Sequence, residues 1–380
     1  MSRSVYITRM SNFLPNEPVS NESMEAILGL INDAPSKARQ LILRNNQIKN
    51  RYYALDKKGN PTHTNAQLTK LAIEKMFDND FKADNIQVLS CGTTSPDQIL
   101  PSHAAMVHGE LGGKAVEINS TTGACSAGIQ AMKFGYMSVL SGASNNAVCT
   151  GSDLLSVWML AKYFKEEATK IAALESNPMI AFDKDFLRFM LSDGAAAALL
   201  ESEPNKNGKI SLRIEWIEQQ SFAHELEVCM YAGAVKNDDG KLTGWSNLPQ
   251  EEWTSNSVFA MKQDTKLLGE FIVKKGAELL KKVIDKRKLD LESVTYFLPH
   301  LSSQYFASRI VSGMEEQGMK VPKERWFTNL SSRGNTGAGA PYLILEDIFN
   351  SGKLKTGDTL LLMVPESARF NYGIVLLTVV

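Results

Sequence analysis

Residues 121–128 read TTGACSAG, a stretch in which a single cysteine stands among threonine, glycine, alanine and serine. A strand-like segment, AVEIN (115–119), precedes it. An apolar pattern at helical spacing follows it, formed by Ile129, Met132, Tyr136 and Val139. Cys125 is therefore predicted to lie at the N-terminus of a helix that ends near Gly142. Taken alone, such a cysteine is more often a small core residue than a nucleophile, because free cysteine packs like a hydrophobe.

The predicted position of Cys125 favours its ionised form. Unpaired N–H groups and the helix dipole at a helix N-terminus stabilise a thiolate, which lowers the thiol pKa from its usual value of about 8.5. Small neighbours would also let substrate atoms approach the sulfur and nearby backbone N–H groups. We therefore expect a thiolate that is open to substrate at this turn.

Composition indicates an ordinary globular protein. The chain has 380 residues, 43% hydrophobic and 22% charged, enough for two packed domains. Its 41 Lys and Arg against 42 Asp and Glu leave no charge excess typical of nucleic-acid binding. The N-terminus lacks a signal-peptide pattern, and no apolar run has the length of a bilayer span. We expect a cytoplasmic protein with neither a nucleic-acid nor a membrane partner.

The cysteine and histidine spacings suggest neither a zinc site nor a disulfide framework, and we expect no metal and no cofactor. The four cysteines are far apart and form no C-x-x-C pair. Four histidines without metal-like spacing are treated as structural, namely His63, His103, His108 and His224. Three cysteines without small neighbours are treated as core or surface residues, namely Cys91, Cys149 and Cys229.

Strand-like and helical segments occur in one order twice along the chain. The first set comprises a helix at 65–76, a strand at 86–91, a helix from Ser102, a strand at 115–119, the helix after Cys125, and strands at 146–151 and 195–202. The second comprises a helix at 257–282, a strand at 294–299, a helix from Ser302, a strand at 325–329, a helix from Thr336, and strands at 359–364 and 372–380. Such repetition indicates two similar units, which we place at 1–205 and 206–380. Short apolar strands suit sheets with helices on both faces, so we predict a duplicated α/β/α/β/α stack.

Two polar residues follow strands in the second unit. His300 ends the strand at 294–299, and Asn335 lies in RGNTGAGAP (333–341), where small residues again begin a helix. Alone, each is more often structural, because asparagine caps helices and forms turns. Together with Cys125 they lie at carboxyl ends of strands, where open α/β sheets bind ligands. A cysteine nucleophile with histidine and asparagine as proton carrier or hydrogen-bond donors is a complete set for acyl transfer.

Seven segments in order resemble motifs of the thiolase superfamily and, within it, of the ketoacyl synthase III group of decarboxylating condensing enzymes. They are NNQIKNRYYA (45–54), CGTTSPDQILPSHA (91–104), TTGACSAG (121–128), TGSDLLS (150–156), LSDGAAAALL (191–200), FLPHLSS (297–303) and RGNTGAGAP (333–341). The resemblance runs through nearly the whole chain. It implies a five-layered thiolase fold, a homodimer, and a catalytic set of Cys125, His300 and Asn335. Residues 115–119 would lie at the dimer edge, and Leu100 would gate the neighbour's pocket.

The last loop departs from the group's pattern. A glycine-rich loop that supplies an oxyanion-hole N–H corresponds here to PESARFNYG (365–373). The resemblance therefore implies that Ser367 or Ala368 offers this donor and that Arg369 or Phe370 reshapes the pocket.

Two further departures concern the second substrate. LSS follows His300 where the group usually has QAN, and Asn45 stands where relatives that bind coenzyme A carry an arginine. The substitution at Asn45 favours an acyl carrier protein over free coenzyme A as the thioester partner. Six basic residues could receive an acidic carrier, although a charge run on a helix is usually only its solvated face. They are Lys274, Lys275, Lys281, Lys282, Lys286 and Arg287.

Several functions fit parts of this pattern. A degradative thiolase would have a second cysteine near the C-terminus, whereas the last cysteine is Cys229. The sequence around Cys125 is unlike the segment that carries the cysteine of papain-like proteases. A non-catalytic partner subunit would normally have lost the nucleophile or the histidine, whereas both are present here.

Among active synthases, the segment at 42–68 and the loop at 365–373 are most similar to ketosynthase/cyclases that build dialkylresorcinols and cyclohexanediones. Small residues around Cys125 would then leave room for a two-chain intermediate. The alternative is an initiating synthase that joins an acyl primer to malonyl carrier protein.

Overall fold

The main sheet contains strands from both halves of the chain. The computed structural model describes residues 3–36, 38–164, 186–206 and 208–380. The first half contributes β1 (Tyr6–Phe13), β4 (Val88–Thr93), β5 (Glu117–Thr122), β6 (Asn146–Asp153) and β7 (Gly194–Glu201). The second half contributes β8 (Leu212–Ser221), β13 (Tyr296–Pro299), β14 (Thr359–Glu366) and β15 (Asn371–Val379). The order is β13-β14-β15-β8-β1-β7-β6-β4-β5.

Strand pairing repeats from one half to the other. In the first half β4 runs parallel to β6, β6 antiparallel to β7, and β7 antiparallel to β1. In the second half β13, β14, β15 and β8 pair in the same sequence of directions. The halves join through two residue pairs between β1 and β8, Tyr6 with Arg213 and Ile7 with Leu212. The predicted duplication of one α/β order is confirmed.

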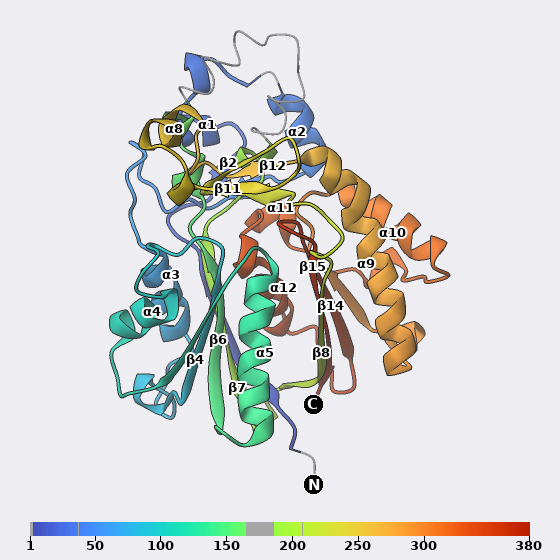
Figure 1. Cartoon of the computed structure of the whole chain (residues 1–380). Coiled ribbons are helices and arrows are strands. Elements are labelled where there is room, and N and C mark those ends of the chain that lie inside the picture. Colours follow the sequence, from blue (N-terminus) through green and yellow to red (C-terminus); the bar gives the residue numbers. More distant parts are fainter. Residues whose placement is uncertain (1–2, 37, 165–185, 207) are drawn as a thin grey trace.

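Helices complete five layers, as Figure 1 shows. α3 (Asn65–Glu74) and α4 (His103–Leu111) cover the outer face of the first half. α9 (Thr265–Arg287) and α10 (Tyr305–Glu316) cover the outer face of the second half. α5 (Ser126–Ser141) and α12 (Ala340–Phe349) lie between the halves. The fold is the predicted α/β/α/β/α stack.

Alternating side chains explain why strands of this composition are buried on both faces. In β7, Ala195, Ala197 and Leu199 belong to the outer core with α3 and α4. Their neighbours Ala196 and Ala198 belong to the central core with α5 and α12. Successive side chains of a strand point to opposite faces, so a continuous apolar run serves two helical layers.

Two predicted elements differ from the structure. The helix predicted from residue 257 begins at Thr265, because the Asp264 carboxylate caps it by accepting the Leu267 N–H at 2.9 Å. The predicted strand at 325–329 is wrong: the segment makes a single bridge, between Trp326 and Phe297. A 3-10 turn at Lys323–Arg325 comes directly before Trp326, and α11 (Leu330–Arg333) follows, so the stretch between them is too short to extend the pairing.

Short elements gather at one end of the sheet, the upper end in Figure 1. They are β2 (Val19–Ser20), α1 (Met24–Leu28), α2 (Arg39–Asn46), β3 (Asn50–Arg51), β9 (Met230–Tyr231), β10 (Ala234–Lys236), β11 (Leu242–Gly244), α8 (Gln250–Ser255), β12 (Lys262–Gln263) and α11 (Leu330–Arg333). Among the helices that the structure describes, none is long and apolar enough to cross a membrane.

Candidate active site

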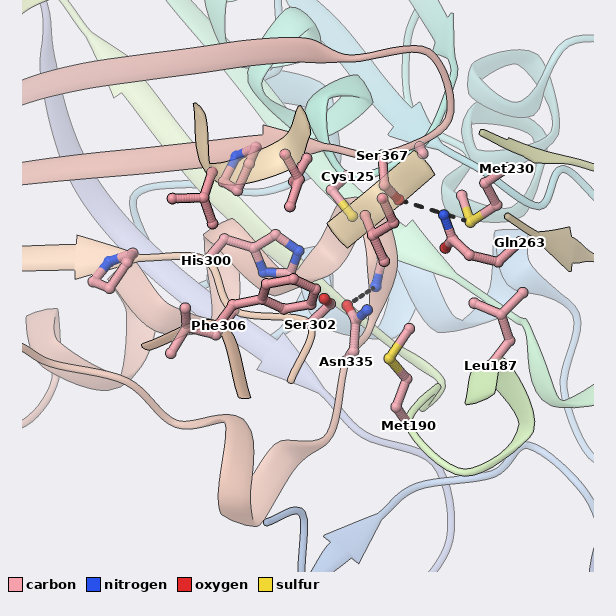
Figure 2. Close-up of a pocket in the computed structure, with 18 of the residues that line it drawn as sticks. Cys125, Leu187, Met190, Met230, Gln263, His300, Ser302, Phe306, Asn335 and Ser367 are labelled. Atoms are coloured by element: carbon pink, nitrogen blue, oxygen red, sulfur yellow. Dashed lines mark hydrogen bonds between the residues drawn. The ribbon is translucent and has the colours of Figure 1, made fainter. Parts of the chain in front are cut away.

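A single cavity is lined by Cys125, His300 and Asn335, which come from three different segments (Figure 2). The volume of this cavity is about 60 Å³, which is room for several waters. Cys125 precedes α5, His300 follows β13, and Asn335 follows α11. The structure therefore places the three predicted residues around one space.

Cys125 is the N-cap residue of α5, and the helix ends at Gly142 in a left-handed conformation (φ 82°), as its sequence predicts. Its side chain is buried. The expected lowering of the thiol pKa is wrong: burial raises the pKa of Cys125, and the Glu366 and Asp153 carboxylates raise it further. Desolvation disfavours the thiolate more than the first turn of α5 favours it, so the resting sulfur is a protonated thiol.

The small residues around Cys125 have a packing role that differs from the expected one. A Cβ on Gly128 would collide with the Ala338 carbonyl oxygen, and so would a Cβ on Gly151. A Cβ on Gly92 would collide with the Ala127 carbonyl oxygen. Gly128 and Gly151 thus allow the first half to approach the turn before α12, and Gly92 allows β4 to approach α5. The small side chains let the two halves approach closely, rather than simply leaving space for substrate.

His300 is held by its backbone, which leaves its ring available. The backbone N–H of His300 donates to the carbonyl of Met363, in β14, at 2.8 Å. Burial lowers the pKa of the imidazole to about 4, so the ring is neutral at pH 7. Nε2 is buried and has no hydrogen-bond partner within the described residues. A buried polar atom in a cavity wall is a natural contact for a substrate oxygen or proton.

Asn335 is oriented by three hydrogen bonds. Its backbone N–H donates to the Met190 carbonyl at 3.0 Å, and its carbonyl accepts the Ser192 N–H at 2.8 Å. Its side-chain Oδ1 accepts the Gly337 N–H at 3.0 Å (Figure 2). Since Oδ1 is engaged by the following turn, the Nδ2 amide is the part of the side chain that can donate to a substrate.

A buried carboxylate organises the loop after β14. Glu366 accepts the Ala368 N–H at 2.9 Å and the Asn371 N–H at 3.0 Å. Burial raises the pKa of this carboxyl group despite these bonds. The Ala368 N–H is thus already engaged, whereas Ser367 lines the cavity, and the identity of the oxyanion donor stays a prediction. No sequence motif singled out Glu366 as a site residue.

Two residues with an expected pocket role lie away from this cavity. Phe370 is fully buried in the core of the second half, and its ring packs edge-on against Phe271 at 6.1 Å. Leu100 is 81% exposed, on the loop before α4. Its expected contact is with a second subunit, so its gating role stays a prediction.

Ion pairs occupy most of the basic cluster on α9. Lys275 pairs with Glu225 and Glu278, and Lys281 pairs with Asp285. Lys286 and Arg287 both bind Glu218. Pairing within the chain leaves little unbalanced positive charge for an acidic carrier, which favours the solvated-face interpretation of this helix.

Apolar side chains from α9 and α10 also line the cavity, and the sequence analysis did not assign them to the site. They are Leu268, Ile272, Val273, Ala277, Phe306, Ile310 and Met314. Their helical spacing alone is equally typical of an ordinary core face, so no local signal distinguishes them.

Comparisons with known proteins agree with this architecture. The family model "Beta-ketoacyl synthase, N-terminal domain" matches residues 60–205, and "3-Oxoacyl-[acyl-carrier-protein (ACP)] synthase III C terminal" matches residues 284–378. A beta-ketoacyl-[acyl-carrier-protein] synthase III from Clostridium perfringens is 24% identical over 355 residues, which covers 92% of each chain.

Two solved structures share the fold over almost the whole chain. The tetronic acid condensing enzyme AbyA1 superposes with a TM-score of 0.77 at 19% identity, covering 98% of this chain and 99% of its own. OleA from Xanthomonas campestris, solved with lauric acid and lauroyl-CoA, has a TM-score of 0.74 at 16% identity, covering both chains fully (100%). The chain therefore belongs to the thiolase superfamily, among the condensing enzymes related to 3-oxoacyl-[acyl-carrier-protein] synthase III.

Proposed function

We propose that this protein is a ketosynthase/cyclase that joins two acyl thioesters into a 2,5-dialkylcyclohexane-1,3-dione, a precursor of dialkylresorcinols. The observation that carries the proposal is the meeting of Cys125, His300 and Asn335 at one cavity whose remaining wall is largely apolar. A thiol beside two hydrogen-bonding side chains suits acyl transfer, and the apolar wall suits alkyl chains.

The first step loads an acyl group on Cys125. The sulfur attacks the thioester carbonyl, the carbon–sulfur bond to the carrier breaks, and the thiol proton passes to the departing carrier thiol. The backbone N–H groups of Cys125 and Ser367 stabilise the oxyanion of the tetrahedral intermediate. Such donors contribute about 2.7–4 kcal/mol each to transition-state stabilisation.

The second step forms the ring from a β-ketoacyl thioester and an α,β-unsaturated acyl group on Cys125. C2 of the ketoacyl group adds to C3 of the unsaturated chain, and C4 then attacks C1 and releases the Cys125 thiol. Water hydrolyses the remaining thioester, and carbon dioxide leaves. His300 and Asn335 hydrogen-bond the enolate oxygen. Holding both reactive ends together contributes roughly 7–11 kcal/mol.

No redox step occurs in ring closure, so aromatisation to a resorcinol is assigned to a separate oxidase. The thioester carrier is proposed to be an acyl carrier protein. The names of the curated relatives refer to that carrier, and Asn45 replaces the arginine expected for coenzyme A.

The second candidate is an initiating 3-oxoacyl-[acyl-carrier-protein] synthase III that condenses an acyl primer with malonyl carrier protein. The activity in the names of the curated relatives favours it. It needs the same Cys125, His300 and Asn335, but the second substrate is malonyl and the product is linear.

The test supplies purified protein with an α,β-unsaturated acyl thioester and a β-ketoacyl thioester. Mass spectrometry and NMR should detect a cyclohexanedione. Linear β-ketoacyl product alone, with malonyl carrier protein preferred, would select the second candidate. Protein that gains no acyl mass at Cys125 would instead be a non-catalytic partner subunit.

Step-resolved variants assign the roles of the three residues. Cys125→Ala should abolish loading and product, whereas Cys149→Ala, buried in β6, should retain both. His300→Ala and Asn335→Ala should reduce ring formation by about 100-fold or more and affect loading of Cys125 less. Slow loading followed by normal condensation in these two variants would contradict the roles.

A further inference from the structure

The cavity beside Cys125 continues into the outer layer of the second half. Part of its wall comes from Ile272 and Val273 of α9, Ile310 and Met314 of α10, and Met363 of β14. All five side chains are apolar, and they lie on elements different from those that carry Cys125 and Asn335. A cavity wall that is apolar away from its polar end fits an alkyl chain better than a polar carrier group.

A second hollow opens on the surface at the end of α10. The volume of this hollow is about 380 Å³. Apolar residues form its floor, including Val311, Met319 and Trp326, and charged residues such as Glu315 and Lys323 form its rim. Met314 is the single described residue that lines both this groove and the inner cavity.

Met314 therefore lies in the wall between the two spaces. The helices themselves are in contact at this level, because a Cβ on Gly313 would lie 2.7 Å from Val273 Cγ1. Methionine has three flexible side-chain torsions and adapts to irregular spaces. Five of the 26 residues around the inner cavity are methionines, so its wall can adjust at several points. Rotation of the Met314 side chain would join the two spaces at a lower free-energy cost than separation of α9 from α10.

We propose that Met314 gates an alkyl channel that runs from the reacting carbonyl, between α9 and α10, into the surface groove. The proposal rests on the proposed function in that the channel holds the tail of one acyl thioester substrate. Short tails end before Met314. Longer tails displace it, and their final carbons contact Trp326 and Met319 in the groove. Met314 is thus a specificity-determining residue for chain length.

The first test measures loading of Cys125 with straight-chain acyl thioesters of increasing length. Met314→Trp should slow the loading of long chains by about tenfold or more and leave the loading of short chains unchanged. Met314→Ala should speed the loading of long chains. Ser312→Trp is the matched control, since Ser312 is exposed on the same helix and lines neither space. The same length profile in all four proteins would overturn the proposal.

The second test reports the channel without any reaction. A long-chain acyl-CoA with a diazirine on its terminal carbon is bound, photolysed and mapped by mass spectrometry. Labels on Trp326 or Met319 are expected in the wild type and in Ser312→Trp, and should be lost in Met314→Trp. Labels confined to other walls, or no label, would overturn the channel. Groove labelling without acylation of Cys125 would leave the channel standing and reject the proposed function.

Discussion

At the residue scale, the resting thiol of Cys125 is controlled by its surroundings rather than by its helix. Burial raises its pKa, with Glu366 and Asp153 as further causes. Asp153 is held in place because it accepts hydrogen bonds from Thr94 and from the Ala338 N–H. The two carboxylates therefore support the loops around the cavity, and they add to the effect of burial in keeping the thiol protonated.

The buried imidazole of His300 predicts a pH-dependent stability. Its pKa is about 4 in the folded protein against 6.5 for the free group. Between these values the unfolded chain binds a proton that the folded chain does not, so the free energy of unfolding falls as pH falls from about 6.5 to about 4. The loss of stability over this pH range is about 3 kcal/mol, because each pKa unit corresponds to about 1.4 kcal/mol.

Urea unfolding at several pH values measures this contribution. His300→Gln should lose stability less steeply than the wild type below about pH 6.5. His224→Gln, at an exposed histidine, should keep the wild-type slope. Equal slopes in wild type and His300→Gln would show that His300 is not held neutral.

At the element scale, the contact between the turns that begin α5 and α12 depends on glycine. Gly128→Ala places a methyl group against the Ala338 carbonyl oxygen and 3.0 Å from Tyr342 Cε2. We expect a loss of about 1–3 kcal/mol in the free energy of unfolding, together with slower loading of Cys125, because the adjacent turn must move.

Gly109→Ala is the matched control for this substitution. Gly109 lies within α4 and has no atom within 4 Å of an added Cβ. Alanine there should raise stability by up to about 1 kcal/mol, since glycine is the poorer helix former. Thermal or urea unfolding of both variants decides the matter, and equal stabilities would contradict a close approach at Gly128.

At the scale of the whole molecule, β5 ends the sheet with an edge that pairs with no other strand in the described part of the chain. It exposes Ile118, which is 40% accessible. Exposed edges of this kind invite pairing with a second chain. The structure contains one chain, so the homodimer stays a prediction.

Light scattering should give twice the chain mass of 41.9 kDa at micromolar concentration. Ile118→Lys should shift the protein toward monomer, whereas Leu242→Lys, at a residue of similar exposure (37%) on β11, should not. A monomeric wild type would reject the interface.

The gating role expected for Leu100 is tested in the dimer. Leu100→Trp should change the chain-length preference, and an unchanged preference would reject the gate.

The sequence by itself determined the repeated order of elements, the placement of Cys125 at a helix start and that of His300 after a strand. These features depend on apolar periodicity and small-residue turns, which are local. Asn335 follows α11 and not the strand expected before it. The strand expected at 325–329 is absent because a 3-10 turn and α11 confine the extended stretch to a single bridge. The division of the chain at 205 and 206 and the catalytic roles stay predictions.

Only the tertiary structure decided the electrostatics and the shape of the site. The pKa of Cys125 depends on burial and on Glu366, which is far from it in sequence. The Ala368 N–H is engaged by a carboxylate that the sequence pattern did not single out. The apolar part of the cavity wall exists because α9 packs against both α10 and β14. Desolvation, charge proximity and empty space are sums over neighbours in three dimensions, so no local pattern in the chain encodes them.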